Sequence, residues 1–171
     1  MVTESSRKTR ASSADLDYQS GILPGVSRTF ALTIPVLPDA LAVVMTNAYL
    51  LCRIADTIED DPGLSHEQKS QFHERFVAVV RDAQAAESFA RDLAPLLSDR
   101  VLPAEHDLVR NTAAVIRVTH GCSAEEREAL TRCVGIMCRG MPEFQRNKSL
   151  RGLRDLDELA DYCYYVAGVV G

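Results

Sequence analysis

Apolar residues recur every three or four positions along most of this 171-residue chain. The longest such pattern follows Pro38 and consists of Leu41, Val44, Met45, Ala48, Leu51, Cys52 and Ala55. This period places them on one side of a helix. Pro38 suits the first turn, Asp61-Pro62-Gly63 ends the helix, and the roughly 23 residues between them would extend some 35 Å. Since no alternating strand pattern occurs, the sequence predicts an all-α protein.

Capping signals and prolines divide the rest of the chain into further helices. Three helix starts have the spacing of a capping box: Ser65-x-x-Gln68, Ser123-x-x-Glu126 and Asp155-x-x-Glu158. Other expected helices cover the residues from Ser13 to Gly21 or Pro24, residues 86–99 around Pro95, residues 103–121, and residues 156–171. The run 27–34 is expected to end at Pro35.

The composition suits a single domain, because 46% of the residues are hydrophobic and 25% are charged. We expect a flexible polar tail over residues 1–13 and one all-α unit over residues 14–171. A net charge of −5 argues against a nucleic-acid binder that neutralises phosphates. The cysteines form no CxxC pair and the N-terminus lacks an apolar signal core. Both features predict a cytoplasmic location.

An acidic cluster at the end of the long helix is the strongest local candidate for chemistry. Asp56 and Asp60 lie one helical turn apart, so one face presents both carboxylates, with Glu59 beside them. A helix C-terminus already carries partial negative charge, and the acids repel one another. A divalent cation would relieve both effects, and Mg²⁺ favours one or two carboxylates plus substrate phosphate oxygens. The alternative is a solvated acidic helix end.

Two further places could contact an anion. A guanidinium offers several fixed donors to phosphate oxygens, and a hydroxyl adds another, so Ser27-Arg28 and Arg53 are candidates. Arg53 would equally suit an ion pair within its own helix, with Asp56 or a nearby acid. Ser27 would equally suit a helix cap.

The expected last helix has an aromatic and aliphatic face formed by Tyr162, Tyr165, Val166 and Val169. Ala167 and Gly171 form a small-x-x-x-small pair that would allow a close helix approach. Such a face is typical of core packing. It also suits an apolar wall for a long hydrocarbon, because aromatic rings stabilise cations that form beside them. The pattern leaves both interpretations open.

Four segments together resemble the squalene and phytoene synthase family: SRTFALTI (27–34), CRIADTIEDD (52–61), CRGMPEF (138–144) and YCYYVAGVVG (162–171). They occur in the family's order, and the last one is the most specific. DTIEDD and GMPEF look more like squalene synthases than phytoene synthases. A chain-elongating prenyltransferase or a terpene cyclase would share the acid-rich helix but not YCYYVAGVVG.

The resemblance implies an isoprenoid-synthase-type helical bundle and the Mg²⁺-dependent head-to-head condensation of two farnesyl diphosphates. The reaction would pass through a cyclopropyl (presqualene) diphosphate to squalene, with NADPH as reductant. Phytoene, dehydrosqualene or a hydroxylated relative are alternative products. The implied partner is a prenyl diphosphate, and an apolar product is compatible with a peripheral membrane contact.

The resemblance also assigns roles to residues of this chain. It implies that the Mg²⁺ ligands are Asp56, Glu59 and Asp60, with Asp56 and Asp60 acting in catalysis. It implies that the diphosphate ligands are Ser27, Arg28 and Arg53. Tyr162 would supply a catalytic hydroxyl. The prenyl-chain channel would be lined by Val166, Ala167 and Val169.

One feature of the family has no counterpart here. The second aspartate-rich motif, which lies on a later helix and completes the metal site, matches nothing after Asp61. We therefore expect that the bundle is truncated to its first half, that the remainder of the domain follows Gly171, and that this chain alone is inactive. The alternative is a non-catalytic helical fragment that binds a partner.

Overall fold

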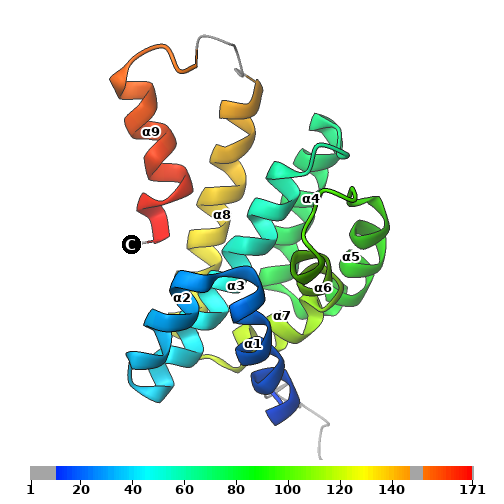
Figure 1. Cartoon of the computed structure of the whole chain (residues 1–171), viewed down its shortest axis with the longest axis vertical. Helices are drawn as coiled ribbons and strands as arrows, with labels where there is room; N and C mark the ends of the chain where they lie inside the picture. Colours follow the sequence, from blue (N-terminus) through cyan, green and yellow to red (C-terminus); the bar gives the residue numbers. More distant parts are fainter. Residues whose placement is uncertain (1–10, 147–151, 171) are drawn as a thin grey trace, which may run out of the picture.

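A computed structural model describes residues 11–146 and 152–170, and the regular structure in these two ranges is entirely helical (Figure 1). The α-helices are α1 (Ser13–Val26), α2 (Arg28–Thr33), α3 (Asp39–Asp60), α4 (His66–Arg81), α5 (Ala86–Leu93), α6 (Pro103–Arg110), α7 (Thr112–Gly121), α8 (Ala124–Arg146) and α9 (Leu156–Val166). The 3₁₀ turns are η1 (Ile34–Val36), η2 (Ala83–Ala85), η3 (Ala94–Leu96) and η4 (Gly168–Val170). The all-α prediction is confirmed. Residues 1–10 of the expected tail lie outside the described residues.

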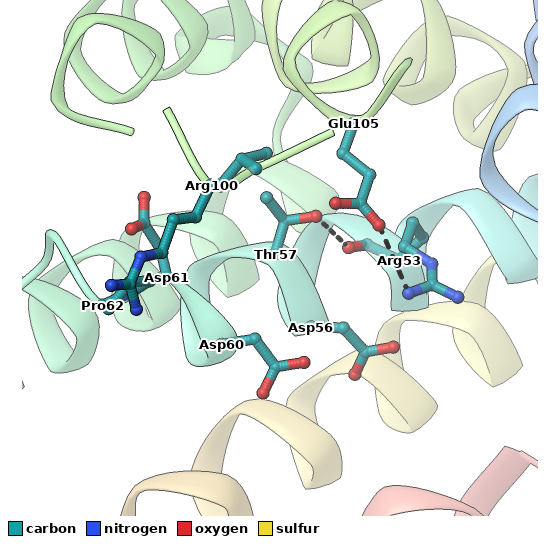
Figure 2. A pocket seen from close by; sticks show the side chains of 9 residues that line it. Arg53, Asp56, Thr57, Asp60, Asp61, Pro62, Arg100 and Glu105 are labelled. Carbon is teal, nitrogen blue, oxygen red and sulfur yellow. Dashed lines mark hydrogen bonds and ion pairs between the residues drawn. The ribbon is translucent and has the colours of Figure 1, made fainter. Parts of the chain in front are cut away.

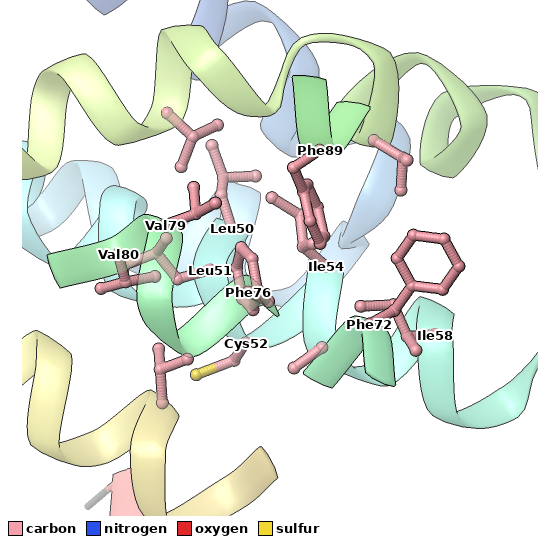
Figure 3. Packing of buried hydrophobic residues seen from close by; sticks show 14 of the residues in the cluster. Leu50, Leu51, Cys52, Ile54, Ile58, Phe72, Phe76, Val79, Val80 and Phe89 are labelled. Atoms are coloured by element: carbon pink, nitrogen blue, oxygen red, sulfur yellow. The ribbon is translucent and has the colours of Figure 1, made fainter. Parts of the chain in front are cut away.

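Helix α3 is the central element, in contact with α1, α4, α6, α7 and α8. Leu50, Ile54 and Ile58 are fully buried along it. They pack with Phe76 of α4 and Phe89 of α5, whose ring centroids lie 5.4 Å apart (Figure 3). Burying each of these side chains contributes roughly 1.5–3 kcal/mol. These buried side chains therefore hold α3 in place from several sides, so that its last turn has a fixed position in the fold.

The same helix has the length and composition of a membrane span, and it is the one such helix among the described residues. Half of that segment is buried inside the fold. Its apolar residues are therefore accounted for by the core that they form with α4, α5 and α7.

The predicted capping boxes start helices as expected. The Ser65 hydroxyl accepts from the Gln68 amide at 3.2 Å, and the Gln68 side chain accepts from the Ser65 amide at 2.9 Å. Ser123 and Glu126 are bonded in the same reciprocal way. At the third start, the Glu158 amide donates to the Asp155 carboxylate at 2.9 Å.

Two helix boundaries differ from the predicted ones. Helix α1 continues through Gly21 and Pro24, because burial of Leu23 and Val26 against the core outweighs the cost of both residues. The expected helix over 103–121 is interrupted at Asn111. The Asn111 side chain donates to the carbonyl of Asp107 at 2.9 Å and so competes with the helical backbone.

Two predicted helix ends are also corrected. The α-helix expected over 86–99 ends at Leu93, and Pro95 lies in the 3₁₀ turn that follows. The expected last helix ends at Val166, because Ala167 has left the helical conformation with φ of −141°. The small-x-x-x-small pair of Ala167 therefore does not lie on α9, and Gly171 is outside the described residues.

Candidate functional site

The last turns of α3 line a cavity of about 310 Å³ that also contacts α6 and the segment before it. Its lining residues are Arg53, Asp56, Thr57, Asp60, Asp61, Pro62, Arg100, Val101 and Glu105. Figure 2 shows that the side chains of Asp56 and Asp60 point to the same side of α3. The predicted pairing of these two carboxylates on one face is therefore present in a real cavity.

The electrostatics of Asp56 differ from those of a solvated surface acid. Burial raises its pKa to about 6; Arg53 opposes this increase, whereas Asp60 and Glu105 add to it. The ionised form of Asp56 is thus held in a site that would be stabilised by a further positive charge. Binding of a cation or a proton beside Asp56 would therefore be favourable.

Glu59, the third predicted metal ligand, lies differently. Its residue is buried and does not line the cavity, and its backbone carbonyl accepts a hydrogen bond from Lys69 of α4. Within residues 11–146 and 152–170, no group of three His, Cys, Asp or Glu side chains is arranged to hold a metal ion. The structure thus places Asp56 and Asp60, but not Glu59, in the lining of the cavity.

Arg53 also lines the cavity and is held by two contacts. Its guanidinium donates to the Tyr49 hydroxyl at 2.7 Å and lies 3.5 Å from the Glu105 carboxylate of α6. The ion pair expected within its own helix is thus replaced by one to another helix. The buried Nε atom has no hydrogen-bond partner among the described residues, which leaves a donor available to an anion.

Asp61 continues the acidic sequence but has a structural role. Its two carboxylate oxygens accept from the Gly63 amide at 2.7 Å and from the Ser98 amide at 2.8 Å. Burial by itself would raise the pKa of this carboxyl group, but the hydrogen bonds from Ser98 and Gly63 outweigh burial and lower it. Asp61 therefore joins the end of α3 to the segment that closes the cavity.

The other predicted diphosphate contacts lie at the start of α2. Ser27 is the N-cap, and its hydroxyl accepts from the Phe30 amide at 3.1 Å. Arg28 is exposed in the first turn, and neither residue lines the cavity. Tyr49 connects this region to Arg53, because its hydroxyl donates to the carbonyl of Val26 at 3.0 Å.

The predicted residues of the C-terminal segment lie on α9 and η4, which both contact α8. Tyr162 is 39% exposed on α9. Val169 packs against the core cluster, and Ala167 is exposed. The side chain of Val166 lies outside what the structure describes. The core-packing interpretation thus holds for Val169, and Tyr162 is left accessible.

Sequence reasoning missed four polar residues around the cavity: Tyr49, Thr57, Arg100 and Glu105. A signal existed for Tyr49, which lies one helical turn before Arg53 and hence on the same face. Glu105 follows Pro103 in the first turn of α6, where an acid is usually explained by the helix dipole. No pattern in the sequence indicates that α6 would bring it to Arg53.

Comparison with known proteins gives concordant results. A squalene/phytoene synthase family profile matches residues 23–171. Squalene synthase R6 of a Phoma species is 32% identical over 145 residues, covering 85% of this chain and 32% of that protein. Squalene synthase ERG9 of Saccharomyces cerevisiae is 30% identical over 151 residues, covering 85% of this chain and 31% of that protein.

Solved structures extend the similarity to the fold. A complex of TcSQS with the ligand BPH1237 superposes with a TM-score of 0.77 at 25% identity, covering 92% of this chain and 42% of the solved one. A second complex, with E5700, gives 0.76 at 26% identity. This chain spans about a third of the length of the curated relatives named above. The fold is that of an isoprenoid synthase. The family match over residues 23–171 shows that the chain belongs to the squalene/phytoene synthase family.

Proposed function

We propose that this chain carries the first aspartate-rich half of the site at which a squalene synthase condenses two farnesyl diphosphates. The product of the first step would be presqualene diphosphate, and reduction with NADPH would give squalene. The observation that carries the proposal is the cavity at the end of α3. There, two carboxylates and a guanidinium with an unused donor line one space.

The charges of the cavity suit a metal-bound diphosphate. Mg²⁺, held by Asp56 and Asp60, would neutralise the charge that develops on the leaving group. Arg53 would donate to diphosphate oxygens, and its contacts with Tyr49 and Glu105 would orient the guanidinium. We propose Glu59 only as a support of this pair, because it lies outside the lining of the cavity.

The N-terminal half of α3 offers a surface for the prenyl chain. Met45 is 36% exposed, and the helical period puts it on the same side as Asp56, about 16 Å away. Leu41, one turn earlier, is 46% exposed. A prenyl chain whose diphosphate is bound at Asp56 and Asp60 could therefore lie along this apolar surface and cover it from water.

Several assignments remain part of this proposal. Ser27 and Arg28 would contact the diphosphate from the start of α2, which Tyr49 joins to Arg53. Tyr162 would assist proton removal, and Val166, Ala167 and Val169 would border the prenyl chain. The location would be cytoplasmic with a peripheral membrane contact, because the product is apolar.

We further propose that this chain alone does not turn over farnesyl diphosphate, because the family's second aspartate-rich motif is not among its residues. Two carboxylates would bind a metal–diphosphate complex but leave the metal site incomplete. Turnover of farnesyl diphosphate by the isolated 171-residue chain would contradict this.

The experiment that tests the proposal replaces Asp56 with asparagine. In the purified protein as the cell makes it, we expect Asp56→Asn to reduce the turnover of farnesyl diphosphate roughly 100-fold or more, since several kcal/mol of charge stabilisation are lost. Asp39→Asn is the matched control, because Asp39 is exposed in the first turn of the same helix. Equal rates in the two variants would exclude Asp56 from the metal site. Product analysis with and without NADPH separates squalene from dehydrosqualene or phytoene.

A further inference from the structure

A second cavity, of about 480 Å³, lies between the end of α4 and the first half of α8. It is lined by Arg81, Ala124, Arg127, Glu128, Thr131, Arg132, Gly135 and Arg139. Four of these eight residues are arginines, and one is an acid. A groove with this excess of positive charge is unexpected in a chain whose net charge is −5. We call it the arginine groove.

The four guanidinium groups are not engaged in the ion pairs that join the described residues. The ion pairs among the described residues involve Arg53, Arg75, Arg91, Arg117 and Arg154. No arginine of the groove makes an ion pair with a described residue. Surface arginines normally gain little from such pairs, but four guanidinium groups and one carboxylate in a single groove leave an excess positive potential that an anion would neutralise.

Two of these charges lie on one face of α8. Arg132 and Arg139 are two helical turns apart on one face, with Gly135 between them. From Arg127 to Arg139 the helix advances about 18 Å. A Cβ atom at Gly135 would lie 3.4 Å from an Nη atom of Arg139, an ordinary van der Waals distance, so that guanidinium lies back along the helix beside Gly135.

Other elements add to the positive potential. Arg81 approaches from the last turn of α4. Ala124 is the first residue of a 23-residue helix, where the helix dipole contributes partial positive charge that Glu125 and Glu126 of the same turn offset in part. The groove shares no residue with the cavity at the end of α3. The buried face of α8, which includes Met137 and Met141, is turned to the core, so the groove lies on the other side of that helix.

We propose that the arginine groove binds the phosphate groups of an extended polyanion. Guanidinium forks match phosphate oxygens in a bidentate geometry. Guanidinium groups that are distributed over about 18 Å of the helix axis can engage several phosphates together rather than one isolated ion. Two sources share this chemistry, a soluble polyphosphate and the headgroups of an anionic lipid surface. The inference does not depend on the proposed catalytic function.

Binding to two probes tests the proposal. One probe is sodium tripolyphosphate, followed by calorimetry in Mg²⁺-free buffer so that the acidic cavity does not contribute. The other is a phosphatidylglycerol–phosphatidylcholine vesicle, followed by co-sedimentation, with pure phosphatidylcholine vesicles as the neutral reference. The groove variant is Arg132→Gln with Arg139→Gln, since both residues are exposed. The matched control is Arg91→Gln with Arg110→Gln, which removes the same charge from another exposed surface.

We expect the groove variant to weaken binding of at least one probe at least about tenfold, because each lost arginine contributes on the order of 1 kcal/mol near an anionic surface. The control variant should retain wild-type affinity. Loss confined to vesicles identifies a lipid surface as the source, and loss of tripolyphosphate binding identifies a soluble anion. Failure of the wild-type protein to bind either probe, or equal losses in both variants, would overturn the proposal. Circular dichroism checks that each variant is folded.

Discussion

Asp60 and Asp61 are neighbours in the sequence with opposite environments. The Asp60 residue is exposed at the cavity, whereas Asp61 is 1% exposed and bonded to two backbone amides. Asp60 is thus placed to contact a ligand, whereas Asp61 stabilises the backbone around the site. The aspartate-rich motif contains both kinds of residue, and its sequence alone does not distinguish them.

This difference predicts opposite effects of the same substitution. Asp61→Ala leaves the amides of Gly63 and Ser98 without their acceptor, so we expect it to lower the free energy of unfolding by about 2–3 kcal/mol. Asp60→Ala should change stability by less than about 0.5 kcal/mol, as is usual for an exposed position, while weakening the binding of Mg²⁺ and diphosphate. Urea unfolding and calorimetry measure the two quantities. Similar unfolding curves for both variants would argue against the structural role of Asp61.

At the scale of elements, Gly140 determines how closely α9 approaches α8. A Cβ atom built at Gly140 would overlap Cδ1 of the Tyr165 ring and would lie at a second short distance, 2.8 Å, from Cβ of Tyr165. The second distance concerns an atom next to the α9 backbone, so rotation of the ring cannot relieve the contact. The close approach predicted for Ala167 and Gly171 is therefore made by a glycine of the other helix.

We expect Gly140→Ala to displace α9 and to lower the melting temperature. Gly21→Ala is the matched control, because Gly21 also lies inside a helix and its Cβ would have no atom within 4 Å. Alanine at that position should stabilise α1 by roughly 0.5–1 kcal/mol. Thermal unfolding followed by circular dichroism compares the two variants. A Gly140→Ala protein as stable as wild type would show that α9 does not pack as described.

The sequence was informative wherever a local rule determined the structure. Periodicity located α3, and the spacing of Ser65 and Gln68 located the start of α4, since both depend on residues within one or two turns. The helix pattern also paired Asp56 with Asp60. It could not show that Glu105 reaches Arg53 or that Glu59 does not line the cavity, because those facts depend on how α3 packs on other helices.

At the scale of the whole molecule, buried polar contacts join α7 to α3 and to the N-terminal helix α1. Asn47 of α3 is fully buried; it donates to the carbonyl of Val115 at 2.9 Å and accepts from the Thr119 hydroxyl at 2.8 Å. Asp15 of α1 and Arg117 of α7 form an ion pair at 2.6 Å. The Asp15 side chain is only 5% exposed. These contacts join segments that are far apart in the chain and hold α3, which carries the acids of the cavity, in its position.

The Asp15–Arg117 pair makes the stability of the whole fold sensitive to acid. Hydrogen bonds from Arg117 outweigh the effect of burial, and with Ser12 they lower the pKa of Asp15 from 3.8 to about 2. Between these values the unfolded chain binds more protons than the folded one, so the stabilisation is fully present above about pH 4 and is lost as the pH falls towards 2. We therefore expect the melting temperature of Asp15→Asn to decrease less between pH 4 and pH 2 than that of the wild-type protein. Asp17→Asn, at an exposed position of the same helix, should follow the wild-type pH dependence. If all three proteins lost stability in parallel over this range, the acid sensitivity would have to arise from carboxylates other than Asp15.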